Sequence, residues 1–188
     1  MGNSTGSHDK FETMTIYCSK KLESFLGKSI RTDIPTDSSG LGDWNGNLFT
    51  VDRKKCLIFM NNKTCYSIIM TNILKKDIVD FGQYFKERLF KQLEYDLKIN
   101  ERQEVKLRKQ LNNIVLTKSN NDKRIIGTMN HHVENLRFND IDGGIDNWDE
   151  VEVNKMLNQR PMGTKIPIEK RRYRDFFVPI DIMKELIQ

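Results

Sequence analysis

The chain has 188 residues, 30% of them charged and 37% hydrophobic, a composition typical of one globular domain with a core of its own. It contains no apolar run near the roughly 18 residues of a membrane-spanning helix, and its first residues lack the apolar segment of a secretory signal. The formal net charge of +5 favours a modest attraction to polyanions.

Three cysteines occur in the sequence: Cys18, Cys56 and Cys65. Their odd number and unrelated spacing do not fit a disulfide framework. Each falls in an expected strand, where a free thiol behaves as a small buried hydrophobe. We therefore expect a cytoplasmic protein that does not contact a membrane. The absence of alanine, with many Asn, Lys and Ile residues, is typical of an AT-rich bacterial or phage genome.

Strand patterns dominate the first part of the chain. Residues 14–18 are expected to form a strand, and Ser19 and Gly27 are suited to begin and end the short helix that follows. Residues 28–43 are rich in Pro, Ser and Gly, which predicts a loop. Three strands joined by hairpin turns are then expected, over residues 44–51, 55–60 and 64–70.

The spacing of apolar residues becomes helical from Asp77 onward, with Ile78, Phe81 and Phe85 three or four positions apart. Helices are expected over residues 77–93, 101–111, 123–138, 147–159 and 181–187, and one further strand over residues 113–118. Asn147 is the expected N-cap of the helix that ends near residue 159, because Glu150 follows it at the third position.

The order of these elements predicts the fold class. Strands followed by helices, with hairpin connections, favour an α+β fold. We expect a small antiparallel sheet of about four strands with helices packed on it. Residues 14–188 are expected to form this single domain, after a disordered extension at residues 1–13.

No motif in the sequence assigns an enzymatic activity. His131 and His132 are adjacent on an expected helix and point about 100° apart, so they do not easily grip one metal ion. HExxH, CxxC and glycine-rich phosphate motifs are absent, and the acidic segment from Asp140 to Glu152 lacks the turn glycine and final glutamate of a calcium loop. We expect no metal and no cofactor, and a hydrolase with a histidine-based site is an alternative.

Two basic clusters support a second alternative, a nucleic-acid-binding protein. The residues of the two clusters are Arg53, Lys54 and Lys55 at a strand turn, and Lys170, Arg171, Arg172 and Arg174 near the C-terminus. Tyr173, Phe176 and Phe177 are interleaved with the second cluster, as in proteins that bind single-stranded nucleic acid. A surface helix with a buried aromatic face has the same pattern, and no known nucleic-acid-binding motif is present.

Four segments resemble the bacterial DUF6933 family, which has no assigned activity. They are MTIYCSKKL, LGDWNGNLFTVDRKKCLIFMNNKT, TKSNNDKRIIGTMNHHVENL and LNQRPMG, which occur in this order and cover most of residues 14–168. The resemblance implies a small bacterial single-domain protein that begins near Met14. Its family-like polar positions are Trp44, Asn47, Asn121, Thr128 and Asn130.

The leading hypothesis is a non-enzymatic binding or regulatory module, with a protein or a nucleic acid as its partner. The residues predicted to bind a ligand or partner are Trp44, Asn47, Asn121, Arg124, Thr128 and Asn130. The region from Asn120 to Asn130 combines polar side chains with a helix N-terminus, whose free N–H groups attract anions. The alternative interpretation of this region is an ordinary polar helix cap.

Overall fold

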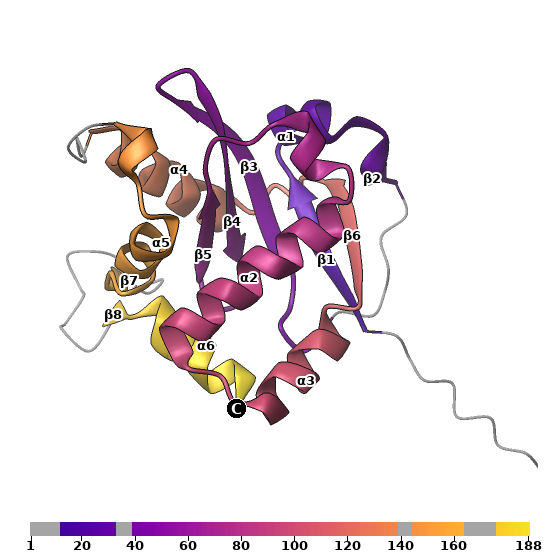
Figure 1. Cartoon of the computed structure of the whole chain (residues 1–188), viewed down its shortest axis with the longest axis vertical. Coiled ribbons are helices and arrows are strands. Elements are labelled where there is room, and N and C mark those ends of the chain that lie inside the picture. The colour runs from indigo at the N-terminus through magenta and orange to yellow at the C-terminus, as the bar shows by residue number, and fades with distance from the viewer. Residues whose placement is uncertain (1–11, 33–38, 139–143, 164–175) are drawn as a thin grey trace, which may run out of the picture.

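A six-stranded mixed sheet forms the centre of the protein, with helices on both of its faces (Figure 1). The computed structural model describes residues 12–32, 39–138, 144–163 and 176–188. The strands lie in the order β2-β6-β1-β3-β4-β5. Their bounds are β1 Thr13–Cys18, β2 Ile30–Arg31, β3 Trp44–Val51, β4 Lys54–Asn61, β5 Ser67–Met70 and β6 Asn113–Lys118.

The described residues also form six α-helices and a short hairpin apart from the main sheet. The helices are α1 Lys20–Leu26, α2 Phe81–Leu97, α3 Glu101–Gln110, α4 Lys123–Phe138, α5 Glu150–Asn158 and α6 Pro179–Ile187, and three 3-10 turns are η1 Gly27–Ser29, η2 Lys75–Ile78 and η3 Ile145–Asn147. The hairpin pairs β7 (Met162–Gly163) with β8 (Phe176–Phe177). Within these residues, no helix has the length and apolarity needed to cross a bilayer.

The prediction of a sheet with helices packed on it is confirmed in part, but the fold is α/β, and the sheet is a mixed, mostly parallel one of six strands instead of an antiparallel one of about four. Only the pairs β3–β4 and β4–β5 are antiparallel. The central strand β1 pairs in parallel with both β3 and β6, and β6 pairs in parallel with β2. The β1–β6 pairing joins Thr13 to Asn113 across a hundred positions of sequence, a contact that local hairpin patterns do not reveal.

Two hydrophobic cores lie on opposite faces of the sheet. On one face, α1, α2, α3 and α6 cover apolar side chains of β1, β3 and β4, and the ring of Trp44 meets that of Phe85 edge-on, with centroids 5.5 Å apart. On the other face, α4 packs on β3 and β4 while α5 packs on β5. The continuous apolar runs of β4 and β5 follow from this burial on both sides.

Most elements form where the sequence pattern predicts them. Ser19 caps α1 by accepting a hydrogen bond from the Leu22 N–H, and Gly27 ends it with φ of 60°. The two-residue strand β2 was missed, since it is too short to show a period and falls within the predicted loop 28–43. The strand predicted from residue 64 begins at Ser67 instead, because Cys65 turns the chain with φ of 59°.

The start of α5 also differs from its prediction. Asp149 is the N-cap, and its Oδ1 accepts hydrogen bonds from the N–H groups of Val151 and Glu152. Asn147 lies in the preceding 3-10 turn η3. Glu150 is therefore the first helical residue and, instead of capping the helix, its side chain is free to reach the sheet.

Three side chains of α5 fasten this helix to the outer edge of β5. Asn158 and Asn154 each form two hydrogen bonds with the backbone, the first with the N–H and C=O of Ser67 and the second with those of Ile69. Glu150 Oε1 accepts from the N–H and the hydroxyl of Thr71. These contacts satisfy backbone groups that an edge strand otherwise leaves unpaired.

We expect Asn154→Asp to lower the free energy of unfolding by about 2–4 kcal/mol at neutral pH. The substitution keeps the size of the side chain and the acceptor for the Ile69 N–H. It replaces the donor to the Ile69 carbonyl with a buried carboxylate oxygen. Urea unfolding measures the change, and the exposed Asn130→Asp is the matched control. Equal stability of the two variants would show that the contact with β5 contributes nothing.

Candidate functional site

The N-terminus of helix α4 is capped by a carboxylate of the protein itself. The Asp122 carboxylate accepts hydrogen bonds from the N–H groups of Arg124 (3.0 Å) and Ile125 (3.2 Å). Such a cap satisfies two of the free N–H groups of the first turn. The N-terminus of α4 is therefore an ordinary polar cap, which was the alternative interpretation of this region. A site for a bound anion must be built from side chains further along the helix.

A stripe of polar and small residues runs along α4 beside its buried face. Arg124, Gly127, Thr128 and His131 lie three or four positions apart, so they share one side of the helix. The core-facing residues of α4 are Ile125, Met129, His132, Val133 and Leu136. His132 lies at the border between the two sets, and it is 1% exposed.

This stripe forms one wall of a pocket of about 530 Å³. The opposite wall comes from the segment that follows α5 and from the β7–β8 hairpin. The lining residues are Cys65, Arg124, Gly127, Thr128, His131, His132, Arg160, Pro161, Met162, Gly163, Phe176 and Phe177. Among the residues that the structure describes, those lining the pocket include two arginines and two histidines but no Asp or Glu.

The Arg124 guanidinium is held in place at the pocket wall. It donates one hydrogen bond to the Asn62 carbonyl oxygen at 2.7 Å and another to Cys65 Sγ at 3.1 Å. Burial raises the pKa of the Cys65 thiol, and the nearby Arg124 only partly opposes this effect. Cys65 is therefore a neutral thiol at pH 7 and an unsuitable nucleophile, because the thiolate is the reactive form.

The two histidines differ in environment, as expected for adjacent residues of a helix. His131 is exposed, whereas burial lowers the pKa of His132 to about 4, with further lowering by the charges of Arg160 and His131. His132 is therefore neutral at physiological pH. Its Nδ1 atom is buried and has no hydrogen-bond partner among the residues that the structure describes. An unpaired buried nitrogen is costly, and it is the kind of group that a bound ligand satisfies.

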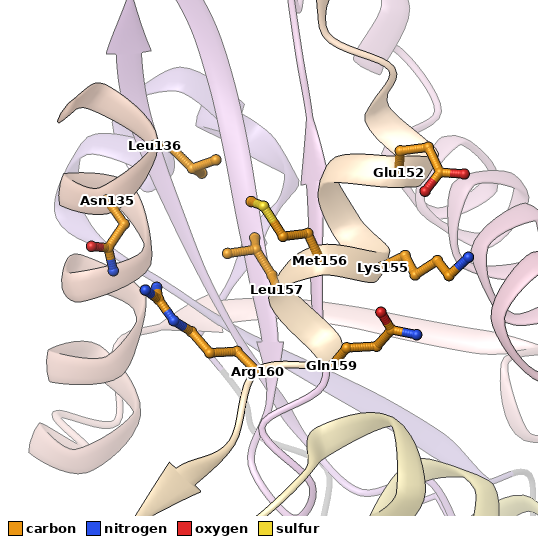
Figure 2. A pocket seen from close by; sticks show the side chains of 8 residues that line it. All are labelled: Asn135, Leu136, Glu152, Lys155, Met156, Leu157, Gln159 and Arg160. Atoms are coloured by element: carbon orange, nitrogen blue, oxygen red, sulfur yellow. The ribbon is translucent and has the colours of Figure 1, made fainter. Parts of the chain in front are cut away.

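A second hollow, of about 420 Å³, adjoins the pocket and shares Arg160 with it. Figure 2 shows Arg160 extending from the end of α5 toward Asn135 on α4. The Asn135 Nδ2 atom is buried, and no described residue is its hydrogen-bond partner. Arg160 and Asn135 thus bring two donor groups near each other, and Asn135 Nδ2 has no acceptor within the described part of the chain. An oxygen atom of a ligand would provide that acceptor.

The residues predicted to bind a ligand separate into two groups. Arg124 and Thr128 line the pocket. Trp44 is fully buried in the core, and the Asn47 side chain accepts a hydrogen bond from the Ser19 hydroxyl at 2.7 Å. The two remaining residues, Asn121 and Asn130, are exposed, and neither lines the pocket.

The basic cluster at the β3–β4 turn is engaged with other parts of the protein. Lys54 forms an ion pair with Asp146, and Lys55 lies over the ring of Phe25 at 4.8 Å from its centroid. Arg53 occupies the turn itself, with φ of 63°. The second cluster, Lys170, Arg171, Arg172 and Arg174, lies outside the described residues.

Several pocket residues were missed by the sequence interpretation, which treated His131 and His132 only as metal ligands or catalytic bases. The stripe from Arg124 to His131 has a helical spacing that could have been found from the sequence. Arg160 carries no such signal, and Phe176 was singled out only as an aromatic residue of the second basic cluster. The folding of α5 and the β7–β8 hairpin brings both residues to α4. No cluster of three or more potential metal ligands occurs within the described part of the chain.

Acidification should destabilise the protein through His132. Its folded-state pKa of about 4 is below the usual 6.5, so the unfolded chain binds more protons between these two pH values and stability falls as the pH is lowered through this window. The loss from this residue reaches about 3 kcal/mol at most. Urea unfolding at several pH values from 7 to 4 should show that the free energy of unfolding depends less on pH in His132→Gln than in the wild type. His131→Gln, which removes only a secondary cause of the lowered pKa of His132, should change the slope much less. A slope unchanged in His132→Gln would refute this assignment.

Comparisons with known proteins give one match, and it covers most of the chain. No curated protein and no solved structure shows detectable similarity to this sequence. The model of a family described as "Domain of unknown function (DUF6933)" matches residues 15–181. This range contains all the residues that line the pocket beside α4. The chain therefore belongs to the DUF6933 family.

Proposed function

We propose that this protein binds a small anionic molecule in the pocket between α4 and the β7–β8 hairpin. The observation that supports the proposal is the charge of the pocket: Arg124 and Arg160 line it together, and none of its described lining residues is acidic. Guanidinium groups form strong, charge-assisted hydrogen bonds with phosphate and carboxylate oxygens. The leading hypothesis of a non-enzymatic binding module remains the basis of this proposal.

The pocket supplies more than charge. Arg124 is oriented in advance by its bonds to Asn62 and Cys65, so less freedom is lost when a ligand binds. His132, whose Nδ1 atom has no partner among the described residues, lines this pocket, and Asn135 lines the adjoining hollow; Arg160 lines both. A ligand with several oxygen atoms suits such a set of nitrogen groups.

Binding is favoured over hydrolysis by the protonation states of the pocket. A cysteine nucleophile would need a low pKa and a base, but burial raises the pKa of Cys65 and its described hydrogen-bond partner is Arg124. A histidine base works best with a pKa near the operating pH, whereas the pKa of His132 is lowered to about 4. The hydrolase alternative thus has less support than a binding role.

The nucleic-acid alternative receives little support from the described surface. Lys54 and Lys55, two of the three basic residues of the β3–β4 turn, already contact Asp146 and Phe25. The arginines of the pocket lie instead in a hollow of limited volume. A concave site of this size is typical of small-molecule binding.

Calorimetric titration with inorganic phosphate and with pyrophosphate, at low salt, tests the proposal. We expect Arg124→Gln and Arg160→Gln each to weaken binding by about 10- to 100-fold, since a hydrogen bond to a charged group contributes about 1.5–3 kcal/mol. Arg137→Gln removes the same charge from an exposed position of α4 outside the pocket and should leave the affinity unchanged.

Two results would contradict the proposal. One is an absence of binding of either anion to the wild-type protein at low salt. The other is an equal loss of affinity in all three variants, which would show that net charge and not the pocket governs binding. Unfolding curves of Arg124→Gln are needed beside the titration, because this side chain also contacts Asn62 and Cys65.

A further inference from the structure

The pocket beside α4 has an apolar side as well as a basic one. Pro161, Met162, Phe176 and Phe177 all line it. Phe177 and Met162 also pack against the core beneath α4 and α5. Phe176 does not belong to that core, and it is 44% exposed. An aromatic side chain of this size is therefore partly exposed at the wall of a pocket that Arg124 and Arg160 also line.

The described residue that pairs with Phe176 does not cover its ring. In the β7–β8 hairpin, Gly163 pairs with Phe176 and Met162 pairs with Phe177. Side chains of directly paired residues lie next to each other on one face of a sheet. Since Gly163 has no side chain, no cross-strand neighbour covers the Phe176 ring at this position.

The facing wall is open as well. Gly127 lies in the second turn of α4, inside the helix, where glycine is disfavoured relative to alanine. A Cβ atom added at Gly127 would meet no other atom within 4 Å. The glycine is therefore not required by tight packing inside the protein. It leaves the α4 backbone accessible from the pocket, one turn from Arg124 and next to Thr128.

We propose that the ligand of this pocket is a nucleoside monophosphate, with its phosphate and sugar oxygen atoms toward Arg124 and Arg160 and its base between the Gly127 backbone and the Phe176 ring. This inference rests on the proposed anion-binding function and adds the chemical class of the ligand. A flat ring fits a space bounded by a glycine and an open aromatic side chain. Thr128 and His131 supply a hydroxyl and an imidazole near the heteroatoms of a base.

Stacking on Phe176 is the interaction that distinguishes a nucleotide from other phosphates. Contact of a base with an aromatic side chain strengthens binding by about 5- to 100-fold. The pocket volume of about 530 Å³ lies in the range of sites for molecules of this size. Both the charge of the two arginines and stacking on the Phe176 ring are thus expected to contribute to the affinity for the ligand.

Titration calorimetry of the full chain with AMP, GMP, CMP, UMP and ribose 5-phosphate separates the two parts. At least one nucleotide should bind about 5- to 100-fold more tightly than ribose 5-phosphate. Phe176→Ala should lower the affinity for that nucleotide to the level of ribose 5-phosphate and leave the affinity for ribose 5-phosphate unchanged. Phe138→Ala is the control, because Phe138 is 84% exposed on α4 and lies outside the pocket.

Substitutions that fill the space at Gly127 give a second test, with variants that are expected to be at least as stable as the wild-type protein. Gly127→Ala should raise the midpoint of thermal unfolding by about 2–4 °C. Gly127→Leu should unfold no earlier than the wild type, since leucine favours helices and the site is open. The leucine should weaken the binding of the nucleotide more than tenfold and the binding of inorganic phosphate much less.

The outcomes distinguish the two proposals. If ribose 5-phosphate binds as tightly as every nucleotide, or if Gly127→Leu leaves nucleotide affinity unchanged, the assignment of the base site is wrong and the anion site stands. If neither inorganic phosphate nor ribose 5-phosphate binds, the anion-binding function fails together with the nucleotide assignment.

Discussion

The arrangement of this protein depends on how the exposed edge of β5 is satisfied. An edge strand presents unpaired N–H and C=O groups at every second residue, about 6.6 Å apart. Successive turns of α5 place side chains at four-residue intervals, about 6 Å apart along the axis. Because the two repeats are similar, each of three successive turns of α5 contacts a strand residue. The pairs are Glu150 with Thr71, Asn154 with Ile69, and Asn158 with Ser67. A helix thereby takes the place of a seventh strand, and its direction is antiparallel to β5.

This docking also builds the pocket. Arg160 follows Asn158 by two residues, so the hydrogen bonds of Asn158 to Ser67 fix the point from which Arg160 reaches α4. The other end of α5 is held by Glu150, whose second oxygen accepts a hydrogen bond from Arg88 of α2 at 2.8 Å. The same helix therefore protects the sheet edge and positions one of the two arginines. The second arginine is positioned independently, by the β4–β5 turn.

The pocket combines features that are costly for stability but useful for binding. Cys65 has a left-handed backbone, Gly127 lies inside a helix, and nitrogen atoms of His132 and Asn135 are buried with no partner among the described residues. Each disfavours the folded state in a different way, through strain, through helix propensity or through lost hydrogen bonds. All of them lie around α4 and its neighbours, whereas the opposite face of the sheet is filled by apolar side chains such as Trp44, Phe59 and Phe85.

Local chemistry determined which segments became helices and strands. The apolar alternation of β3, the spacing of α4 and the caps at Ser19 and Gly27 could be predicted from the sequence because their causes lie within a few residues. The sequence likewise indicated Arg124 and Thr128, which share the N-terminal half of one helix. Only the tertiary structure decided that β1 pairs with β6 in parallel, and that Arg160 and Phe176 face α4. Those contacts join residues far apart in the chain, and burial and edge pairing select them over many alternatives with the same local patterns.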